Sequence, residues 1–124
     1  MDSPIGKVAP ARYGIVEGGK EAVTEFRMVA SSDAFSLVEA RPLTGRTHQI
    51  RVHFSALHHP LVGDLTYGAD HTIADRLEMT RPWLHAKELS LTHPITGADL
   101  HFSSPYPADL TRTLSLLEAN QERD

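Results

Sequence analysis

The order of apolar and polar positions predicts strands in the first third of the chain. Residues 13–17, 22–30 and 35–42 each carry apolar side chains in the alternating or clustered pattern of a strand. Gly18–Gly19 and Ser31–Asp33 separate these segments and are typical of tight turns. Three consecutive strands on short turns predict an antiparallel meander.

After residue 42 the pattern changes to that of a helix. Thr47 is a suitable N-cap for a helix over residues 48–58. At about 100° per residue, three apolar side chains fall within about 60° of one another and predict a core-facing stripe. The stripe consists of Ile50, Phe54 and Leu57. A different face carries His48, Arg51, Ser55 and His58. The pattern therefore predicts a helix that is anchored on one side and basic on another.

The rest of the chain predicts a hairpin and a last helix. Residues 70–81 are polar and indicate either a loose helix or an insertion without regular structure. Residues 84–92 and 98–103 predict a hairpin closed by the turn Pro94–Gly97, and Pro107 is typical of the first position of a helix. Because strands and helices are segregated along the chain, we expect an α+β fold, dominated by an antiparallel or mixed sheet, with two or three helices.

The length of 124 residues suits one domain. Residues 1–12 contain two prolines and a glycine without any period, and we expect an extended lead-in there. The folded domain is expected over residues 13–119, followed by a tail at residues 120–124.

The composition excludes several classes of protein. The chain has no cysteine, which excludes disulfides, thiolate metal sites and cysteine nucleophiles. No apolar run approaches the roughly 18 residues of a membrane span, and the residues after Met1 do not form a secretory leader. We therefore expect a cytoplasmic protein without a membrane partner.

The net charge is −4, but the charge is distributed unevenly. Residues 35–59 hold Arg41, Arg46 and Arg51 against one glutamate, whereas residues 60–124 hold ten acidic and five basic side chains. A basic segment inside an acidic chain is typical of a polyanion site, although three arginines also cluster by chance.

The most specific motif lies in residues 43–68. It begins with Leu-Thr-Gly-Arg-Thr-His-Gln-Ile-Arg-Val-His and continues with His-Pro-Leu-Val-Gly-Asp and Tyr-Gly. This stretch resembles the signature of the RluA-type pseudouridine synthases. The resemblance extends to Pro4–Gly6, Gly19–Lys20 with Ala22, Leu84–Ala86, His93–Gly97, Ser104–Pro105, Pro107 and Asp109. It therefore covers nearly the whole chain.

The resemblance implies the C-terminal part of a catalytic domain that isomerises uridine to pseudouridine in structured ribosomal or transfer RNA, without cofactor or metal. The target base of such enzymes is flipped out of its stack. In this family the catalytic aspartate lies in an Arg-Leu-Asp-x-x-Thr-Ser-Gly motif, which this sequence lacks. We therefore expect a fragment of a longer enzyme or the product of a truncated gene, and we expect the 124-residue chain alone to be inactive. A smaller departure is His58, which stands where the family usually has glycine, the residue that turns most freely.

Residues in and beside the motif are candidates for specific roles, and the role of Arg51 follows from the resemblance. Arg51 matches the basic residue beside the catalytic carboxylate, where a cation within about 4–6 Å keeps an aspartate ionised; the alternative is a solvated helix arginine. Arg46, at the helix entrance, is expected to contact an RNA phosphate, and His48 and Arg41 are further candidates for RNA contact. The pocket or its loop is expected to be supported by Thr47, Gln49, Asp64 and Tyr67.

Two other functions remain open on the sequence. The first is a non-catalytic RNA-binding module derived from the same fold. The second is a metal site, because imidazole and carboxylate groups together suit zinc. Its candidate ligands are His53, His58, His59, His71 and Asp64. No two histidines stand four positions apart, as two ligands on one helix face would, and we expect no metal.

Overall fold

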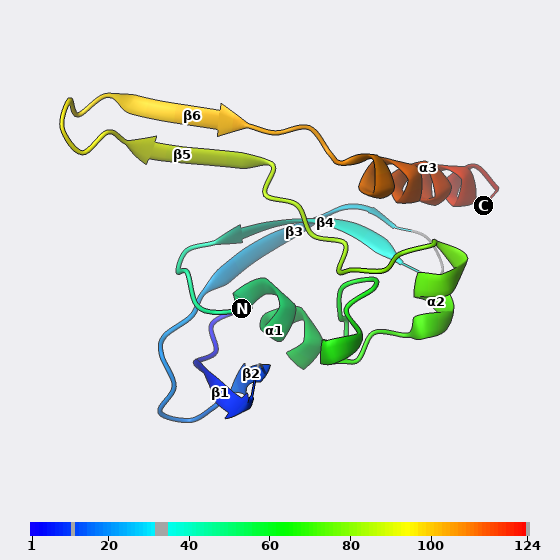
Figure 1. The fold of residues 1–124 in the computed structure, drawn as a ribbon, viewed down its shortest axis with the longest axis horizontal. Coiled ribbons are helices and arrows are strands. Elements are labelled where there is room, and N and C mark those ends of the chain that lie inside the picture. Colours follow the sequence, from blue (N-terminus) through cyan, green and yellow to red (C-terminus); the bar gives the residue numbers. More distant parts are fainter. Residues whose placement is uncertain (11, 32–34, 124) are drawn as a thin grey trace.

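The computed structural model describes residues 1–10, 12–31 and 35–123, with side chains described as far as residue 116 (Figure 1). In chain order the elements are β1 (Ile5–Ala9), β2 (Arg12–Ile15), β3 (Thr24–Ser31), β4 (Ser36–Pro42), α1 (Gln49–Ala56), the short 3-10 helix η1 (Leu65–Tyr67), α2 (His71–Arg76), β5 (Glu88–Thr92), β6 (Asp99–Ser103) and α3 (Ala108–Arg123). Strands and helices are segregated, so the α+β class is confirmed.

The strands of the described residues pair only in twos, which corrects the predicted meander. The three antiparallel pairs are β1–β2, β3–β4 and β5–β6. Gly18 does form a turn, with φ of 83°, but the turn leads to a bridge between Lys20 and Ile5 and not to a β2–β3 hairpin. The physical reason is the side chain of Ile5, which is only 3% exposed and anchors β1 where the meander would have placed β3.

The prediction of a lead-in over residues 1–12 is therefore wrong. The segment supplies β1, and its amino terminus donates a hydrogen bond of 2.7 Å to the carbonyl of Thr24. Ile5 is the only buried side chain of β1, so the segment shows no apolar alternation in the sequence. At the other end, α3 continues through Arg123, so residues 120–123 belong to a helix and not to a tail.

Helix α1 lies between the β1–β2 hairpin and the β3–β4 pair (Figure 1). Its buried face differs from the predicted stripe: Phe54 is buried, but Leu57 lies beyond the end of the helix and is 42% exposed, and Val52 and His53 are buried instead. The predicted N-cap is also wrong. His48 occupies that position with φ of 54°, and Thr47 is exposed and makes no cap.

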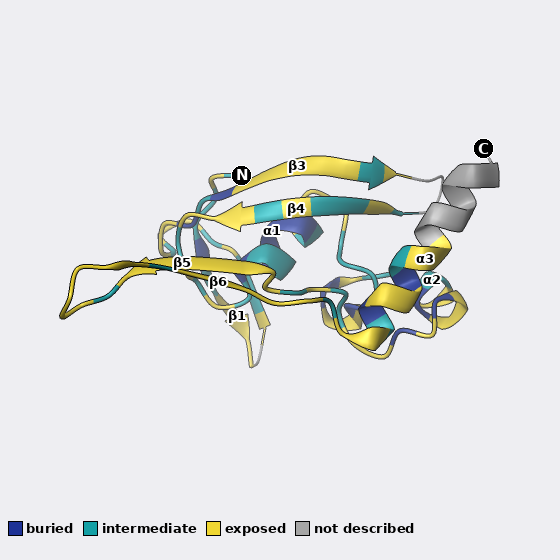
Figure 2. Cartoon of the chain, turned by 90° about the horizontal axis from the view of Figure 1, so that it is seen from above, coloured by how far each residue is buried: buried dark blue, intermediate teal, exposed yellow. Residues whose placement is uncertain are grey.

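The apolar side chains form two clusters, which appear as the dark blue parts of Figure 2. The cluster under α1 consists of Ile5, Ala22, Val52 and Tyr67, with Tyr13 packed against it. The second consists of Ala74, Leu77, Met79 and Leu110, with Phe35, Val62, Ile73, Trp83 and Tyr106 against it. Trp83 donates from Nε1 to the carbonyl of Leu110 at 3.3 Å, so this ring is part of a core. The sequence also places Leu117 on one apolar stripe with Leu110 and Leu114 in the last helix, but the side chain of Leu117 lies outside those that the structure describes.

The remaining elements follow the sequence pattern. Asp70 caps α2 by accepting from the amide of Thr72 at 2.8 Å, which decides between the two structures predicted for residues 70–81. The β5–β6 hairpin is closed at Gly97, with φ of 72°, and extends away from the rest of the chain (Figures 1 and 2). No helix in the described part of the chain is both long and apolar enough to cross a membrane.

Candidate functional site

The centre of the candidate site is a paired arginine and aspartate. Arg51 donates from Nε and Nη2 to the two carboxylate oxygens of Asp64, both at 2.9 Å. The side chain of Asp64 is 1% exposed and that of Arg51 is 21% exposed. The hydrogen bond to Asp64 raises the pKa of the Arg51 guanidinium, which therefore stays charged. A parallel pair of charge-assisted bonds fixes the plane of the guanidinium as well as its position.

Gly63 explains why Asp64 can occupy this place. Its φ is 83°, and a Cβ atom there would lie 2.2 Å from the carbonyl oxygen of Arg81. The adjacent backbone is fixed by the amide of Trp83, which donates to the carbonyl of Val62 at 2.8 Å. Only glycine fits this close approach, so the Gly-Asp pair of the motif places the carboxylate beside Arg51.

Tyr67 lies beneath the guanidinium groups of two arginines. The Cζ atom of Arg51 is 4.8 Å from the ring centroid, and that of Arg12 is 5.3 Å from it. Cation–π attraction adds to the ion pair in holding Arg51. Ser55 donates to the backbone carbonyl of Tyr67 at 2.7 Å, which ties η1 to α1. The basic face predicted for α1 therefore packs against the loop that follows it.

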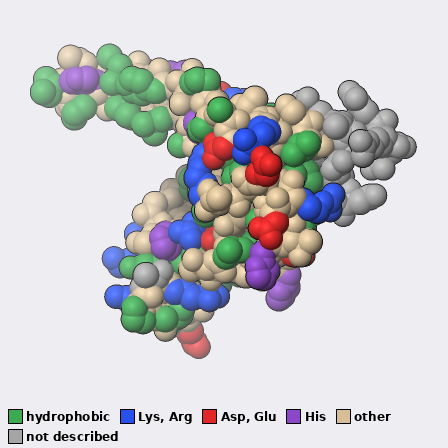
Figure 3. Space-filling model, turned by 45° about the vertical axis from the view of Figure 1, so that its right-hand side comes forward, with side chains coloured by type: hydrophobic (Ala, Val, Ile, Leu, Met, Phe, Trp, Pro, Cys, Tyr) green, Lys and Arg blue, Asp and Glu red, His purple; other side chains and the backbone are tan. Residues whose placement is uncertain are grey.

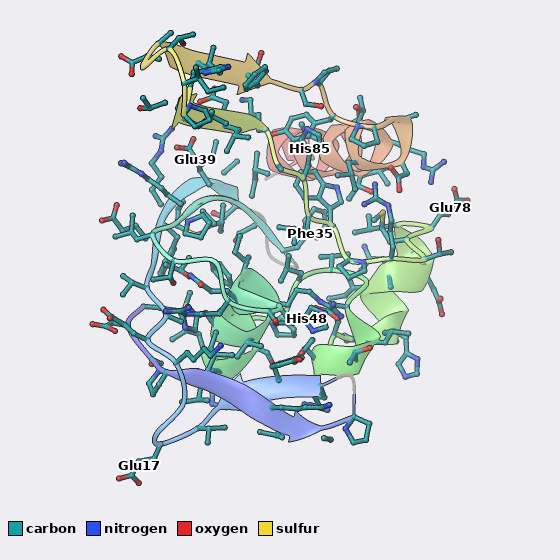
Figure 4. The ribbon with its side chains drawn as sticks, turned by 60° about the vertical axis from the view of Figure 1, so that its left-hand side comes forward. Glu17, Phe35, Glu39, His48, Glu78 and His85 are labelled. Carbon is teal, nitrogen blue, oxygen red and sulfur yellow. The ribbon has the colours of Figure 1, made fainter. Side chains whose placement is uncertain are left out.

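His48 joins this group through the Tyr67 hydroxyl. The hydroxyl accepts from the amide of Tyr13 at 2.9 Å and lies 2.8 Å from Nδ1 of His48. The contact holds the imidazole of His48 through Nδ1, and the tautomer of the ring decides which of the two groups donates. Figure 4 shows His48 between α1 and the β1–β2 hairpin.

Gln49 is a structural residue that holds the segment before α1. Its Oε1 accepts from the hydroxyl of Thr44 at 2.7 Å and from the amide of Arg46 at 3.1 Å. Its Nε2 donates to the carbonyl of Val23 at 2.8 Å and to the hydroxyl of Thr24 at 2.9 Å. The amide side chain thus ties the entrance of α1 to the start of β3.

The other predicted residues lie around this centre but do not all join it. Arg46 donates from Nε to the carbonyl of Glu21, and it lines a cavity of about 360 Å³ together with Thr47. Arg41 is exposed on β4, opposite Glu25 in the register of the sheet. His58 is exposed and has φ of 65°, so it keeps a backbone conformation typical of the glycine it replaces.

The structure also contains a buried network that the sequence did not reveal. His53 is 1% exposed, with Nδ1 2.8 Å from the hydroxyl of Thr24 and Nε2 3.0 Å from the carbonyl of Ser3. A carbonyl only accepts, so Nε2 carries the proton and the Thr24 hydroxyl donates to Nδ1. The side chain of His53 therefore links the N-terminal segment to α1. In the sequence His53 lies beside the predicted apolar stripe of the helix, and nothing in that pattern indicates Thr24 or Ser3 as its partners.

We expect metal chelation to leave the stability of the chain unchanged. Both nitrogens of His53 are used by protein groups, and the described residues contain no group of three or more histidine, aspartate or glutamate side chains that would hold a metal ion. The measurement is the melting temperature with and without EDTA at equal ionic strength. A metal bound to the folded state would add to its stability, so a fall of several degrees in EDTA would contradict this expectation.

Comparison with known proteins identifies the family. The family model described as RNA pseudouridylate synthase matches residues 2–56. An uncharacterized RNA pseudouridine synthase of Mycobacterium bovis is 45% identical over 119 residues, which are 94% of this chain and 39% of the relative. Ribosomal large subunit pseudouridine synthase D of Pseudomonas aeruginosa is 40% identical over 133 residues, covering 98% of this chain and 42% of the relative.

A solved structure agrees with these relatives. Human RNA pseudouridylate synthase domain containing 1 superposes with a TM-score of 0.70 and 31% identity, over 97% of this chain and 58% of that chain. Along nearly its whole length the chain is similar to RNA pseudouridine synthases, and the resemblance seen in its motifs is confirmed. It spans about two fifths of the length of the curated relatives it matches.

Proposed function

We propose that this chain forms part of an RNA pseudouridine synthase and supplies the arginine that supports the catalytic aspartate. The observation that carries the proposal is the fixed orientation of Arg51. The Nε and Nη2 atoms of Arg51 donate to Asp64, whereas Nη1 of Arg51 has no hydrogen-bond partner among the described residues. A second carboxylate has a donor available to it at this nitrogen.

The arrangement suits an arginine that must be in place before the substrate arrives. A donor that is already oriented stabilises a charged group without reorganising at the moment of reaction. Hydrogen bonds to an ionised aspartate favour its charged form, which is the form that acts on a nucleotide. Asp64 and Tyr67 contribute by holding the guanidinium, and we propose this supporting role for both.

The substrate of the proposed enzyme is uridine in structured RNA. Arg46, His48 and Arg41 are proposed to contact that RNA. Arg41 is exposed and makes no ion pair within the described part of the chain. His48 is held at Nδ1 by the hydroxyl of Tyr67, and its Nε2 is proposed as the atom that contacts RNA. Thr47 and Gln49 are proposed to support the loop before α1.

We expect the purified 124-residue chain to form no pseudouridine, because its sequence contains no Arg-Leu-Asp-x-x-Thr-Ser-Gly motif. The test replaces the matching region of Pseudomonas aeruginosa synthase D with this chain, which is 40% identical to it. We expect the chimera to form pseudouridine in large-subunit ribosomal RNA, measured by mass spectrometry of digested RNA. Intact synthase D is the positive control.

Two outcomes would contradict these statements separately. Pseudouridine formed by the 124-residue chain alone would show that its activity does not need the missing motif. A chimera that is folded by circular dichroism but inactive would contradict the proposed function. RNA binding by such an inactive chimera would support the alternative of a non-catalytic RNA-binding module.

A further inference from the structure

A cavity of about 360 Å³ lies beside the candidate site. It is lined by β1, β2, the turn at residues 18–20 and the segment 45–47 before α1. Figure 3 shows lysine and arginine side chains gathered over the lower end of the molecule, where β1 and β2 lie. The described lining contains Lys7, Lys20 and Arg46 and no acidic side chain.

The three cations of this cavity are available to a ligand. None of them takes part in the ion pairs formed within the described residues. Within the described residues the guanidinium of Arg46 donates only through Nε, to the carbonyl of Glu21, and this bond orients the other two nitrogens of the group. Three unneutralised cations from three separate segments, in a chain whose net charge is −4, indicate a site for anions.

Glycines make the wall of the cavity thin. Four of the lining residues are Gly6, Gly18, Gly19 and Gly45. Gly19 is required by the fold, because a Cβ atom there would lie 2.8 Å from the backbone of Ile5. Gly45 is different: its φ is not in the left-handed region and no atom lies within 4 Å of a Cβ built on it. The fold therefore does not explain Gly45, whereas a ligand that approaches the backbone closely does.

The cavity shares a residue with the arginine site. Tyr13 lines the cavity, and its amide donates to the hydroxyl of Tyr67, the ring on which Arg51 lies. A group bound in the cavity is therefore a close neighbour of the paired Arg51 and Asp64.

We propose that this cavity binds the phosphodiester backbone of RNA next to the target uridine, through Lys7, Lys20 and Arg46 and against the backbone at Gly45. This assignment rests on the proposed function for its choice of RNA as the anion. Phosphate contacts position a nucleic acid and carry no sequence information, so the cavity serves the register of the RNA and not the recognition of its bases.

The test measures binding of the 124-residue chain to an RNA hairpin without uridine, by fluorescence anisotropy over a range of KCl concentrations. Each neutralised phosphate contact contributes about 0.7 to 0.9 to the slope of log affinity against log salt. We expect Lys7→Gln, Lys20→Gln and Arg46→Ala each to reduce the slope by about that amount. Arg112→Ala, on the exposed part of α3, is the matched control and is expected to leave the slope unchanged.

A further variant, Gly45→Ala, tests the close approach of RNA to the protein backbone without changing any charge. Gly45→Ala adds one methyl group in open space, so we expect the melting temperature to stay the same and the affinity for the hairpin to fall about tenfold. Equal slopes in the wild type and all four charge variants would overturn the proposal. So would the absence of measurable binding by the wild type, or unchanged affinity in Gly45→Ala.

The two proposals fail in different ways. The hairpin contains no uridine, so its binding does not depend on isomerisation. An active chimera with equal salt slopes would leave the proposed function standing and overturn the phosphate cavity. An inactive chimera, together with the expected salt slopes for the 124-residue chain, would overturn the proposed function and leave the phosphate cavity standing.

Discussion

Replacing Arg51 with alanine is expected to reduce pseudouridine formation by the chimera by at least about 100-fold, the usual cost of removing one oriented donor at a reacting charge. The loss is expected in kcat, with KM for RNA nearly unchanged, because the arginine supports the catalytic carboxylate and not the RNA. Arg51→Lys is also expected to be impaired, since one ammonium group cannot reproduce the paired bonds of a guanidinium to Asp64. The measurement is the steady-state rate over a range of RNA concentrations.

The folding of the variant has to be controlled, because Arg51→Ala leaves the buried carboxylate of Asp64 without its partner. An unpaired buried charge is strongly destabilising. The double variant Arg51→Ala with Asp64→Ala removes both charges, and we expect it to be folded and inactive. Arg27→Ala breaks an exposed ion pair with Glu39 and is the matched control. A raised KM with unchanged kcat would show that Arg51 contacts RNA instead.

His53→Ala is expected to lower the free energy of unfolding of the chain by about 3 kcal/mol. The substitution leaves the hydroxyl of Thr24 without its acceptor and the carbonyl of Ser3 without its donor, and each unsatisfied buried group costs about 1–3 kcal/mol. The lost imidazole also leaves a cavity. The measurement is a urea titration followed by circular dichroism.

His71→Ala is the matched control for that titration, because His71 is exposed at the start of α2. Surface substitutions usually change the free energy of unfolding by no more than about 0.5 kcal/mol. Thr24→Val tests the same network from the other side, since valine cannot donate to His53. Equal effects of His53→Ala and His71→Ala would contradict the structural role of the buried histidine.

The resemblance to RNA pseudouridine synthases and most local elements could be predicted from the sequence. The ten-residue block from Thr44 to His53 identifies the RNA pseudouridine synthases without any structure. The β5–β6 hairpin and α3 also follow their sequence patterns, because a turn at Gly97 and a proline before a helix act over a few residues. The longer motif of residues 43–68 also contains Arg51, Asp64 and Tyr67, which the sequence analysis names as candidate site residues.

The pairing of strands could not be predicted in the same way. A turn at Gly18 is visible in the sequence. The sequence does not show that Lys20, just after this turn, forms a bridge with Ile5 of β1, because that pairing depends on the burial of Ile5 in the folded chain. The N-cap at His48 was missed for a related reason. Its left-handed backbone is stabilised by Tyr67, nineteen positions away, and local propensity favours Thr47.

The sequence by itself therefore determined the resemblance to RNA pseudouridine synthases, the α+β class and the residue types of the candidate site, because these depend on local patterns and on a contiguous motif. Only the tertiary structure decided that Asp64 holds Arg51 on the ring of Tyr67, that His53 is a buried link between the N-terminal segment and α1, and that Lys7 and Lys20 share a cavity with Arg46. The physical reason is the same in each case. Hydrogen bonds and ion pairs act over about 3 Å in space, and the partners here come from segments that only folding brings together.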